Sequence, residues 1–243
     1  MTQFPILIPD PITSAANAEV KFLRSLHERK YRKKSGWFLA EGARICHEAV
    51  ALGWNMHRLA FLAGRETDTA MRQLLDELAA SGGRALPMTE SLLQRISRKD
   101  NPQVLIGAFG QRWHVLQEVS ETSDSIWVAL DRVRDPGNLG TVMRTADAVG
   151  AAGIILVGAC TDPYSVEAVR ASMGAVFNVK ITICSEAEFI TFGIRCVSGL
   201  CSSPKSPSSS APAALKYLRH TTSKGNSIDK SFSKFSTSNL FLP

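Results

Sequence analysis

The feature that most constrains this chain is a run of short apolar segments separated by amphipathic ones in its second half. The spacing predicts strands and helices in alternation, with strands at 126–130, 153–157 and 176–183 and helices at 139–149 and 165–172. Strands joined by such short helical connections lie side by side and parallel, with helices on both faces of the sheet. The second half is therefore predicted to be an α/β unit with a buried parallel sheet.

The first half is expected to form a separate, smaller α/β domain. A helix is predicted over 16–34, followed by helices alternating with strands at 37–40, 57–62, 84–87 and 104–109. The polar segment 116–124 is typical of a linker. We therefore expect one domain over 16–115 and a second over 125–190.

Composition excludes several classes of protein. Hydrophobic residues make up 44% of the chain and charged residues 21%, as in ordinary soluble proteins. The apolar stretches are much shorter than the roughly 20 residues of a membrane helix, and residues 1–14 do not resemble a secretory signal. The five cysteines include no Cys-x-x-Cys pair, which favours reduced thiols over disulfides or zinc. We expect a cytoplasmic protein without a membrane anchor or a metal.

The net charge of +6 arises almost entirely at the C-terminal end. From Phe189 onward seven Lys and Arg residues face a single Asp, whereas residues 1–188 are balanced. The overall charge therefore says little about partners, and a local cluster says more.

Five cations lie at the end of the first predicted helix: Arg29, Lys30, Arg32, Lys33 and Lys34. This pattern fits either a solvated helix end, whose cations favour the helix dipole, or a surface for phosphates.

The most informative string runs from Asp131 to Gly150. Its turn, Asp135-Pro-Gly-Asn138, follows a predicted strand at the sheet edge where α/β folds bind ligands. On the next helix Arg144 lies about 100° around the axis from Met143, off the apolar stripe, where it can point at a ligand. The glycine fingerprints of dinucleotide and P-loop enzymes do not occur.

A second string, Asp162 to Phe177, again joins a strand to a helix. Ser172 and Gly174 suit a hydroxyl and a bare backbone close to a ligand. Ser172 has no His nearby in the sequence that could activate it as a nucleophile. Taken alone, Ser172 is better explained as a side chain that satisfies the helix end.

Together the two strings resemble the SpoU/TrmH family of RNA 2′-O-ribose methyltransferases, in the SPOUT superfamily of knotted methyltransferases. Residues 135–150 are similar to the first motif of the family, and Val169–Phe177 is similar to the second. Residues 20–42 resemble its N-terminal substrate-binding domain. The resemblance covers 18–188 and implies a small α/β substrate-binding domain followed by a parallel-sheet domain of the trefoil-knot type.

The resemblance also implies a reaction, transfer of a methyl group from S-adenosylmethionine (SAM) to a ribose 2′-hydroxyl of structured RNA, rRNA rather than tRNA. Arg144 matches the arginine at the target ribose, and Asn138 would organise the active-site loop. Arg170 and Ser172 would line the site or bind substrate, and Gly158 and Gly174 are candidates for SAM binding. The basic helix would hold RNA phosphates, and the family implies a homodimer.

The resemblance does not continue beyond residue 188, and the sequence changes character abruptly near Phe192. The third motif of the family, Asn-Glu-x-x-Gly followed by Ser-Leu-Asn, supplies much of the SAM pocket, and nothing in 189–243 matches it. Residues 194–243 hold thirteen serines and no Glu, which is typical of a disordered tail over 191–243. We expect a shifted reading frame or a truncation, with a genuinely divergent tail as the alternative, and a methyltransferase domain incomplete at its C-terminus, with an uncovered sheet edge. The alternative function is RNA binding without catalysis.

Overall fold

The computed structural model describes residues 8–99, 103–119, 126–197 and 215–219. The chain divides into two compact units. Unit 1 comprises residues 1–111 together with 162–177, and unit 2 comprises residues 112–161 and 178–243. A segment from the middle of the second half is thus built into unit 1.

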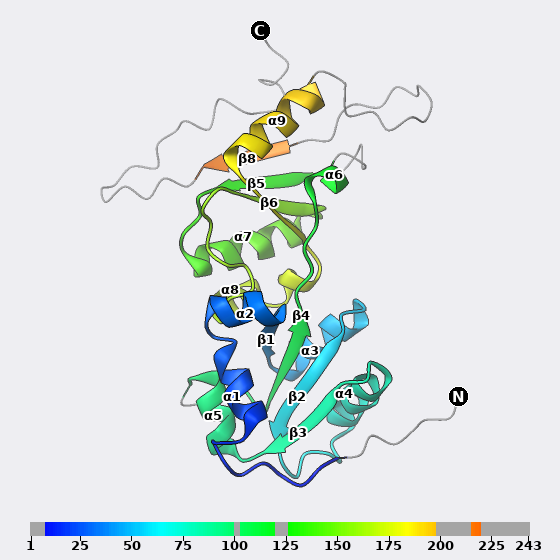
Figure 1. Ribbon diagram of the computed structural model, residues 1–243. Coiled ribbons are helices and arrows are strands. Elements are labelled where there is room, and N and C mark those ends of the chain that lie inside the picture. Colours follow the sequence, from blue (N-terminus) through cyan, green and yellow to red (C-terminus); the bar gives the residue numbers. More distant parts are fainter. Residues whose placement is uncertain (1–7, 100–102, 120–125, 198–214, 220–243) are drawn as a thin grey trace. The chain divides into compact units, whose positions relative to one another are not determined.

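Unit 1 is organised around a mixed four-stranded sheet (Figure 1). Its strands follow the order β1 (Trp37–Glu41), β4 (Leu105–Gly110), β2 (Met56–Leu62), β3 (Arg84–Met88). β4 runs antiparallel to both of its neighbours, and β2 and β3 are parallel. The expected small α/β fold of the first half is confirmed.

Helices cover both faces of this sheet (Figure 1). Side chains alternate across a strand; Ile106 and Ala108 of β4 join one apolar core, whereas a Cβ on Gly107 would meet Cys46 on the other face. The helices of unit 1 are α1 (Ala18–Ser25), α2 (Arg29–Ser35), α3 (Ala43–Ala51), α4 (Thr69–Ala80), α5 (Glu90–Ser97) and α8 (Val166–Ser172), followed by the 3₁₀ turn η1 (Ala175–Phe177).

The single helix predicted over 16–34 is wrong, because the structure has two helices with a break at residues 26–28. Arg32 accounts for the break, since its Nη1 donates to the carbonyls of Leu26 and His27 at 2.7 and 2.8 Å. These carbonyls thereby find a partner outside a continuous helix. A hydrophobic-period argument does not register such a contact.

Unit 2 contains a fully parallel sheet (Figure 1). Its strands follow the order β7 (Lys180–Cys184), β6 (Gly153–Val157), β5 (Trp127–Asp131), β8 (Leu215–Arg219). The helices are α6 (Leu116–Val119), α7 (Pro136–Ala148) and α9 (Glu186–Val197). The predicted parallel sheet is confirmed, while two boundaries differ: α6 lies within the predicted linker, and η1 occupies the start of the strand predicted over 176–183.

The predicted tail over 191–243 is described only at 191–197 and 215–219. Helix α9 extends to Val197, and β8 pairs in parallel with β5. The remainder, on which the expectation of disorder or a shifted reading frame falls, lies outside the described residues. Within the described ranges, no helix is both long and apolar enough to cross a membrane.

Candidate functional site

Helix α7 begins at the turn that the sequence singled out. Asp135 is its N-cap, and the Asp135 carboxylate accepts a hydrogen bond from the Asn138 backbone N–H at 2.7 Å. Pro136 follows at the first helical position, where its missing N–H costs nothing. The turn is therefore specified by residues close together in the sequence, and it fixes the position of Asn138 in the first turn of α7.

The two faces of α7 differ in polarity. Leu139, Met143 and Ala146 are buried, as the periodicity predicts. Asn138 and Arg144 are exposed, so the first-motif side chains face outward from the core. Val149, assigned by periodicity to the buried stripe, lies beyond the helix end and is 63% exposed.

Two loops meet at the carboxyl edge of the sheet in unit 2. The Thr161 N–H donates to the Val133 carbonyl at 2.7 Å, and the Arg132 N–H donates to the Val157 carbonyl at 3.1 Å. The Arg132 Nε also donates to Glu186 at the start of α9, at 2.9 Å. The edge that carries Asn138 is therefore held by bonds between the loops after β5 and β6.

The two glycines proposed for SAM fall in different units. Gly158 follows β6 with a left-handed backbone (φ +69°), and its N–H donates to the Cys184 carbonyl at 2.9 Å. Gly174 lies in unit 1 (φ +106°), where an added Cβ would stand 2.7 Å from a carboxylate oxygen of Glu48. Only Gly158 shares the carboxyl edge of unit 2 with the first motif.

Arg170 of the second motif is paired within unit 1. Its guanidinium lies 2.5 Å from one oxygen of Glu41 and 3.1 Å from the other, and it donates to the Ser97 carbonyl at 2.8 Å. The Glu41 side chain is 3% exposed and that of Arg170 is 28% exposed. This arrangement holds α8 against the end of β1.

Ser172 is fully buried in unit 1. Its hydroxyl donates to the Val169 carbonyl at 2.8 Å and accepts from the Val176 N–H at 3.4 Å. The hydroxyl thus satisfies backbone groups where α8 passes into η1, which matches the simpler reading of this residue from sequence.

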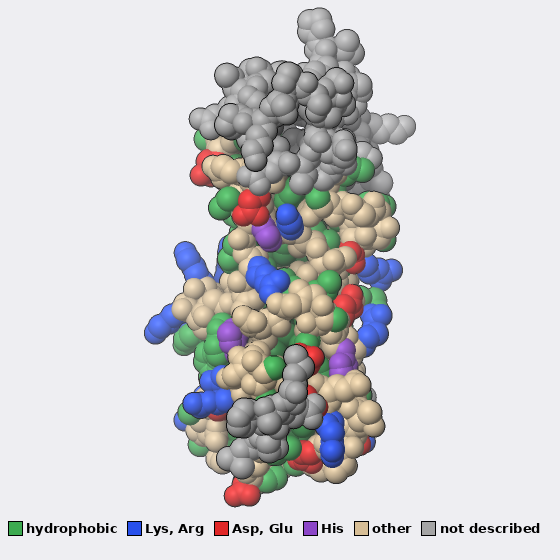
Figure 2. Space-filling model, turned by 90° about the vertical axis from the view of Figure 1, so that its right-hand side faces the viewer, with side chains coloured by type: hydrophobic (Ala, Val, Ile, Leu, Met, Phe, Trp, Pro, Cys, Tyr) green, Lys and Arg blue, Asp and Glu red, His purple; other side chains and the backbone are tan. Residues whose placement is uncertain are grey.

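The predicted basic cluster is split by burial. Arg29, Lys30, Lys33 and Lys34 are exposed on α2, whereas Arg32 is 3% exposed and donates to Asp162 at 2.7 and 2.9 Å. On the face shown in Figure 2, Lys and Arg side chains project in several separate places rather than in one patch. Four of the five predicted cations are therefore available to solvent.

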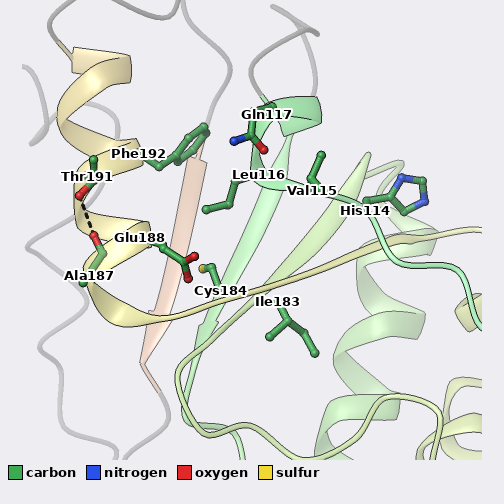
Figure 3. Close-up of a pocket in the computed structure, with 10 residues that line it drawn as sticks. All are labelled: His114, Val115, Leu116, Gln117, Ile183, Cys184, Ala187, Glu188, Thr191 and Phe192. Carbon is green, nitrogen blue, oxygen red and sulfur yellow. Dashed lines mark hydrogen bonds between the residues drawn. The ribbon is translucent and has the colours of Figure 1, made fainter. Parts of the chain in front are cut away.

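A pocket with a volume of about 480 Å³ opens in unit 2 beside β7 (Figure 3). It lies between the 114–117 segment, Ile183 and Cys184 at the end of β7, and the first half of α9. None of the residues proposed from the sequence lines it. Burial raises the pKa of the Cys184 thiol to about 11, which keeps it protonated at neutral pH.

The comparisons with known proteins agree with this architecture. Residues 17–107 match the MRM3-like substrate binding domain, and residues 125–192 match the SpoU rRNA Methylase family. Two crystal structures of an rRNA methyltransferase from Sinorhizobium meliloti, one with AdoMet bound, are 42% identical. The chain covers 68% and 67% of these structures, with 75% of its own length aligned and TM-scores of 0.71 and 0.70.

The chain belongs to the SpoU family of rRNA methylases. An uncharacterized tRNA/rRNA methyltransferase of Synechocystis sp. is 32% identical over 68% of this chain, and a 23S rRNA (uridine-2′-O)-methyltransferase of Streptomyces viridochromogenes is 31% identical over 63%. The chain spans 58% and 53% of the length of these two relatives. The SpoU match ends at residue 192, just beyond the 18–188 over which the sequence resembles the family.

Two acidic residues of this family member were not singled out from the sequence. Glu41 and Asp162 are buried and each pairs with an arginine proposed to bind substrate. Their partners lie 129 and 130 positions away, so no local pattern could identify them. The signal available in the sequence is that each of the two matched regions contains an arginine and a carboxylate that could pair with those of the other region.

Proposed function

We propose that this chain acts in the SAM-dependent methylation of ribose 2′-hydroxyls in structured rRNA. The observation that carries the proposal is the first-motif turn at the carboxyl edge of a parallel sheet, with Asn138 exposed at the start of α7 and Arg144 exposed further along the same helix, in a member of the SpoU family. Ligands of open α/β sheets bind at this edge. The names of the relatives, several of them rRNA methyltransferases, support rRNA rather than tRNA.

Arg144 is proposed to position the ribose and its phosphate. A ribose hydroxyl is a weak nucleophile, so it must be oriented and its proton must be removed. Arginine stays charged in proteins, which suits it to hold a phosphate rather than to take a proton. Asn138 is proposed to shape the loop through its backbone bond to Asp135.

Of the two glycines proposed for SAM, Gly158 fits the cofactor better. It supplies a left-handed backbone without a side chain of its own at the carboxyl edge of unit 2, and the atoms of Glu186 and Arg132 nearest to an added Cβ lie at 3.5 and 3.6 Å, at ordinary contact distance. Gly174 packs against Glu48 in unit 1 and fits the group less well. When bound, SAM would supply an electrophilic methyl group, and Gly158 and its loop would hold the cofactor beside Asn138.

RNA is proposed to bind at α2 through Arg29, Lys30, Lys33 and Lys34. Their side chains are exposed and lie within two turns of one helix. Phosphate contacts of this kind fix position and register but do not read sequence.

We propose residues 16–115 as the substrate-binding domain and residues 125–190 as the methyltransferase domain. We also propose that the protein is a cytoplasmic homodimer.

A second candidate function is RNA binding without catalysis. It is favoured by the sequence of residues 189–243, in which the third motif of the family does not occur. Both functions predict RNA affinity that falls with salt. Only cofactor binding and methyl transfer distinguish them.

The deciding experiment is a calorimetric titration of the full chain with SAM, followed by transfer of labelled methyl groups to rRNA. With methyl transfer, Arg144→Ala should lower the rate at least about 100-fold, since positioning of the hydroxyl is lost. Arg72→Ala, which removes an exposed arginine from α4, is the matched control and should leave the rate unchanged. A folded chain that binds RNA but not SAM would contradict the first function and support the second.

A further inference from the structure

Helix α2 lacks the apolar anchor that holds most surface helices. Of its seven residues, all described by the structure, only Arg32 is buried. A helix of this length is not stable alone in water, because isolated helices need roughly 12–15 residues. The segment continues through Gly36, whose carbonyl accepts from the Gln111 N–H, into β1, and within α2 itself the buried contacts are those of Arg32.

The Arg32 guanidinium uses four of its five N–H donors. Nε and Nη2 donate to one oxygen of Asp162 at 2.9 and 2.7 Å. Nη1 donates to the carbonyls of Leu26 and His27 in the turn before α2. A planar guanidinium can serve all these acceptors at once, whereas a lysine ammonium cannot match the fork.

Asp162 is itself fixed in unit 1. Its second oxygen accepts the Tyr164 backbone N–H at 2.9 Å, and the Tyr164 ring is buried 4.6 Å from the ring of Phe38 in β1. Asp162 belongs to the SpoU match, whereas α2 belongs to the substrate-binding match. The methylase part of the sequence therefore supplies the residue on which the basic helix rests.

We propose that Asp162 is a positioning residue for RNA binding: it holds Arg32, so that Arg29, Lys30, Lys33 and Lys34 form a preordered phosphate-binding surface on α2. This inference rests on the proposed contact between α2 and RNA. Asp162 touches no RNA itself. A surface ordered before binding avoids the entropy cost of immobilising long cationic side chains on a mobile segment.

The sign of one substitution separates positioning from simple electrostatics. Asp162→Asn removes a negative charge, which by Coulomb attraction alone should tighten the binding of a polyanion. Positioning predicts the opposite. A carboxamide has an acceptor oxygen on only one of its two branches, so it cannot satisfy both Arg32 and the Tyr164 N–H, and Arg32 is left without a carboxylate beside it. α2 is then held less firmly, and affinity for RNA falls roughly tenfold as side-chain ordering costs return.

The test uses the full chain and a fluorescein-labelled RNA hairpin, with dissociation constants measured at several KCl concentrations. Hydrogen exchange at residues 29–35 is measured in parallel. The matched control is Glu19→Gln on α1, which also removes one acidic charge in unit 1, together with its ion pairs to Arg58 at 3.0 Å and to Arg84 at 3.5 Å. Asp162→Asn should weaken RNA binding and speed exchange in α2, whereas Glu19→Gln should do neither.

A double variant, Arg32→Gln with Asp162→Asn, leaves no uncompensated buried charge and restores the net charge. It should recover part of the stability lost in Asp162→Asn, but without the Arg32 bonds to the Leu26 and His27 carbonyls α2 should still exchange fast and RNA binding should stay weak. Should Asp162→Asn fail to fold, as judged by circular dichroism, the comparison passes to the double variant and to Arg32→Lys. Arg32→Lys keeps the charge but loses the fork, and it should weaken binding.

Three results would overturn the inference: Asp162→Asn binding RNA as tightly as Glu19→Gln, unchanged exchange in α2, or an Arg32→Lys variant equal to the parent chain. A parent chain without salt-dependent RNA binding would instead contradict the proposed contact between α2 and RNA. In that case the exchange data alone would still decide whether Asp162 holds α2.

Discussion

Helices α7 and α8 both carry residues of the family motifs, yet their polar side chains make different contacts. On α7 the motif residues Asn138 and Arg144 are exposed, and apolar residues make the contacts with the core. On α8 the motif residues Arg170 and Ser172 make structural contacts of their own, to Glu41 and to backbone groups. An arginine is thus exposed in one motif and paired with a buried carboxylate in the other.

The largest expected difference between the helices concerns their arginines. Arg170→Ala leaves the Glu41 carboxylate buried without its partner, so the free energy of unfolding of unit 1 should fall by about 3 kcal/mol. Arg144→Ala removes an exposed side chain, whose interactions are screened by water, and should lower it by about 1 kcal/mol or less. Urea denaturation of both variants, followed by circular dichroism, measures the difference. Equal losses of unfolding free energy in the two variants would contradict the different structural roles of Arg170 and Arg144.

Hydroxyl side chains give a smaller version of the same contrast. Ser172→Ala strips buried backbone groups of a partner and should cost about 1–2 kcal/mol. Thr145→Ala on α7 removes an exposed hydroxyl that bonds only its own helix, to the Thr141 carbonyl, and should cost less than about 0.5 kcal/mol. Thermal unfolding of the two variants side by side provides the measurement. A Ser172→Ala chain as stable as the parent would show that the buried hydroxyl is not needed for the fold.

The helix starts, in contrast, should behave alike. Asp135 and Ser165 are both N-caps whose side chains accept a backbone N–H three residues later, from Asn138 and Ala168. Asp135→Ala and Ser165→Ala should each cost about 1 kcal/mol. Urea midpoints that differ widely between the two would indicate that tertiary contacts, rather than the caps, fix one of these turns.

The smallest expected effect is on how stability depends on pH, and the two units should lose stability in different pH ranges. Burial lowers the pKa of His27 in unit 1 below its usual 6.5, so the folded state favours the neutral ring. That stability is complete above pH 6.5 and is lost as pH falls below it. In unit 2 the hydrogen bond from His114 lowers the pKa of Glu118 below 4.5, so its contribution is lost only in more acid solution.

As the pH is lowered through 6.5, hydrogen exchange should therefore show protection of amides falling in unit 1 before it falls in unit 2. His27→Gln keeps a donor for the Ile96 carbonyl, which His27 meets at 2.6 Å, and removes the titration. This variant should flatten the response of unit 1 near pH 6. His57, whose pKa is also lowered by burial, contributes in the same direction and would account for any response that remains.

Much of the local structure follows from the sequence alone. The Asp135-Pro136 turn carries its own cap and first helical residue, and the buried stripe of α7 follows from the helical period. The parallel sheet follows from short helical connections between apolar strands. These features depend on residues close to one another in the chain, which is why pattern and spacing are sufficient.

The tertiary structure alone decided which charged residues are buried. Arg32 reads as one more cation in a basic helix, and Arg170 as a motif residue of a substrate site. Each is instead paired with a buried carboxylate about 130 positions away, Asp162 or Glu41. Burial of an arginine depends on a partner that compensates for the loss of water, and only folding brings that partner into contact.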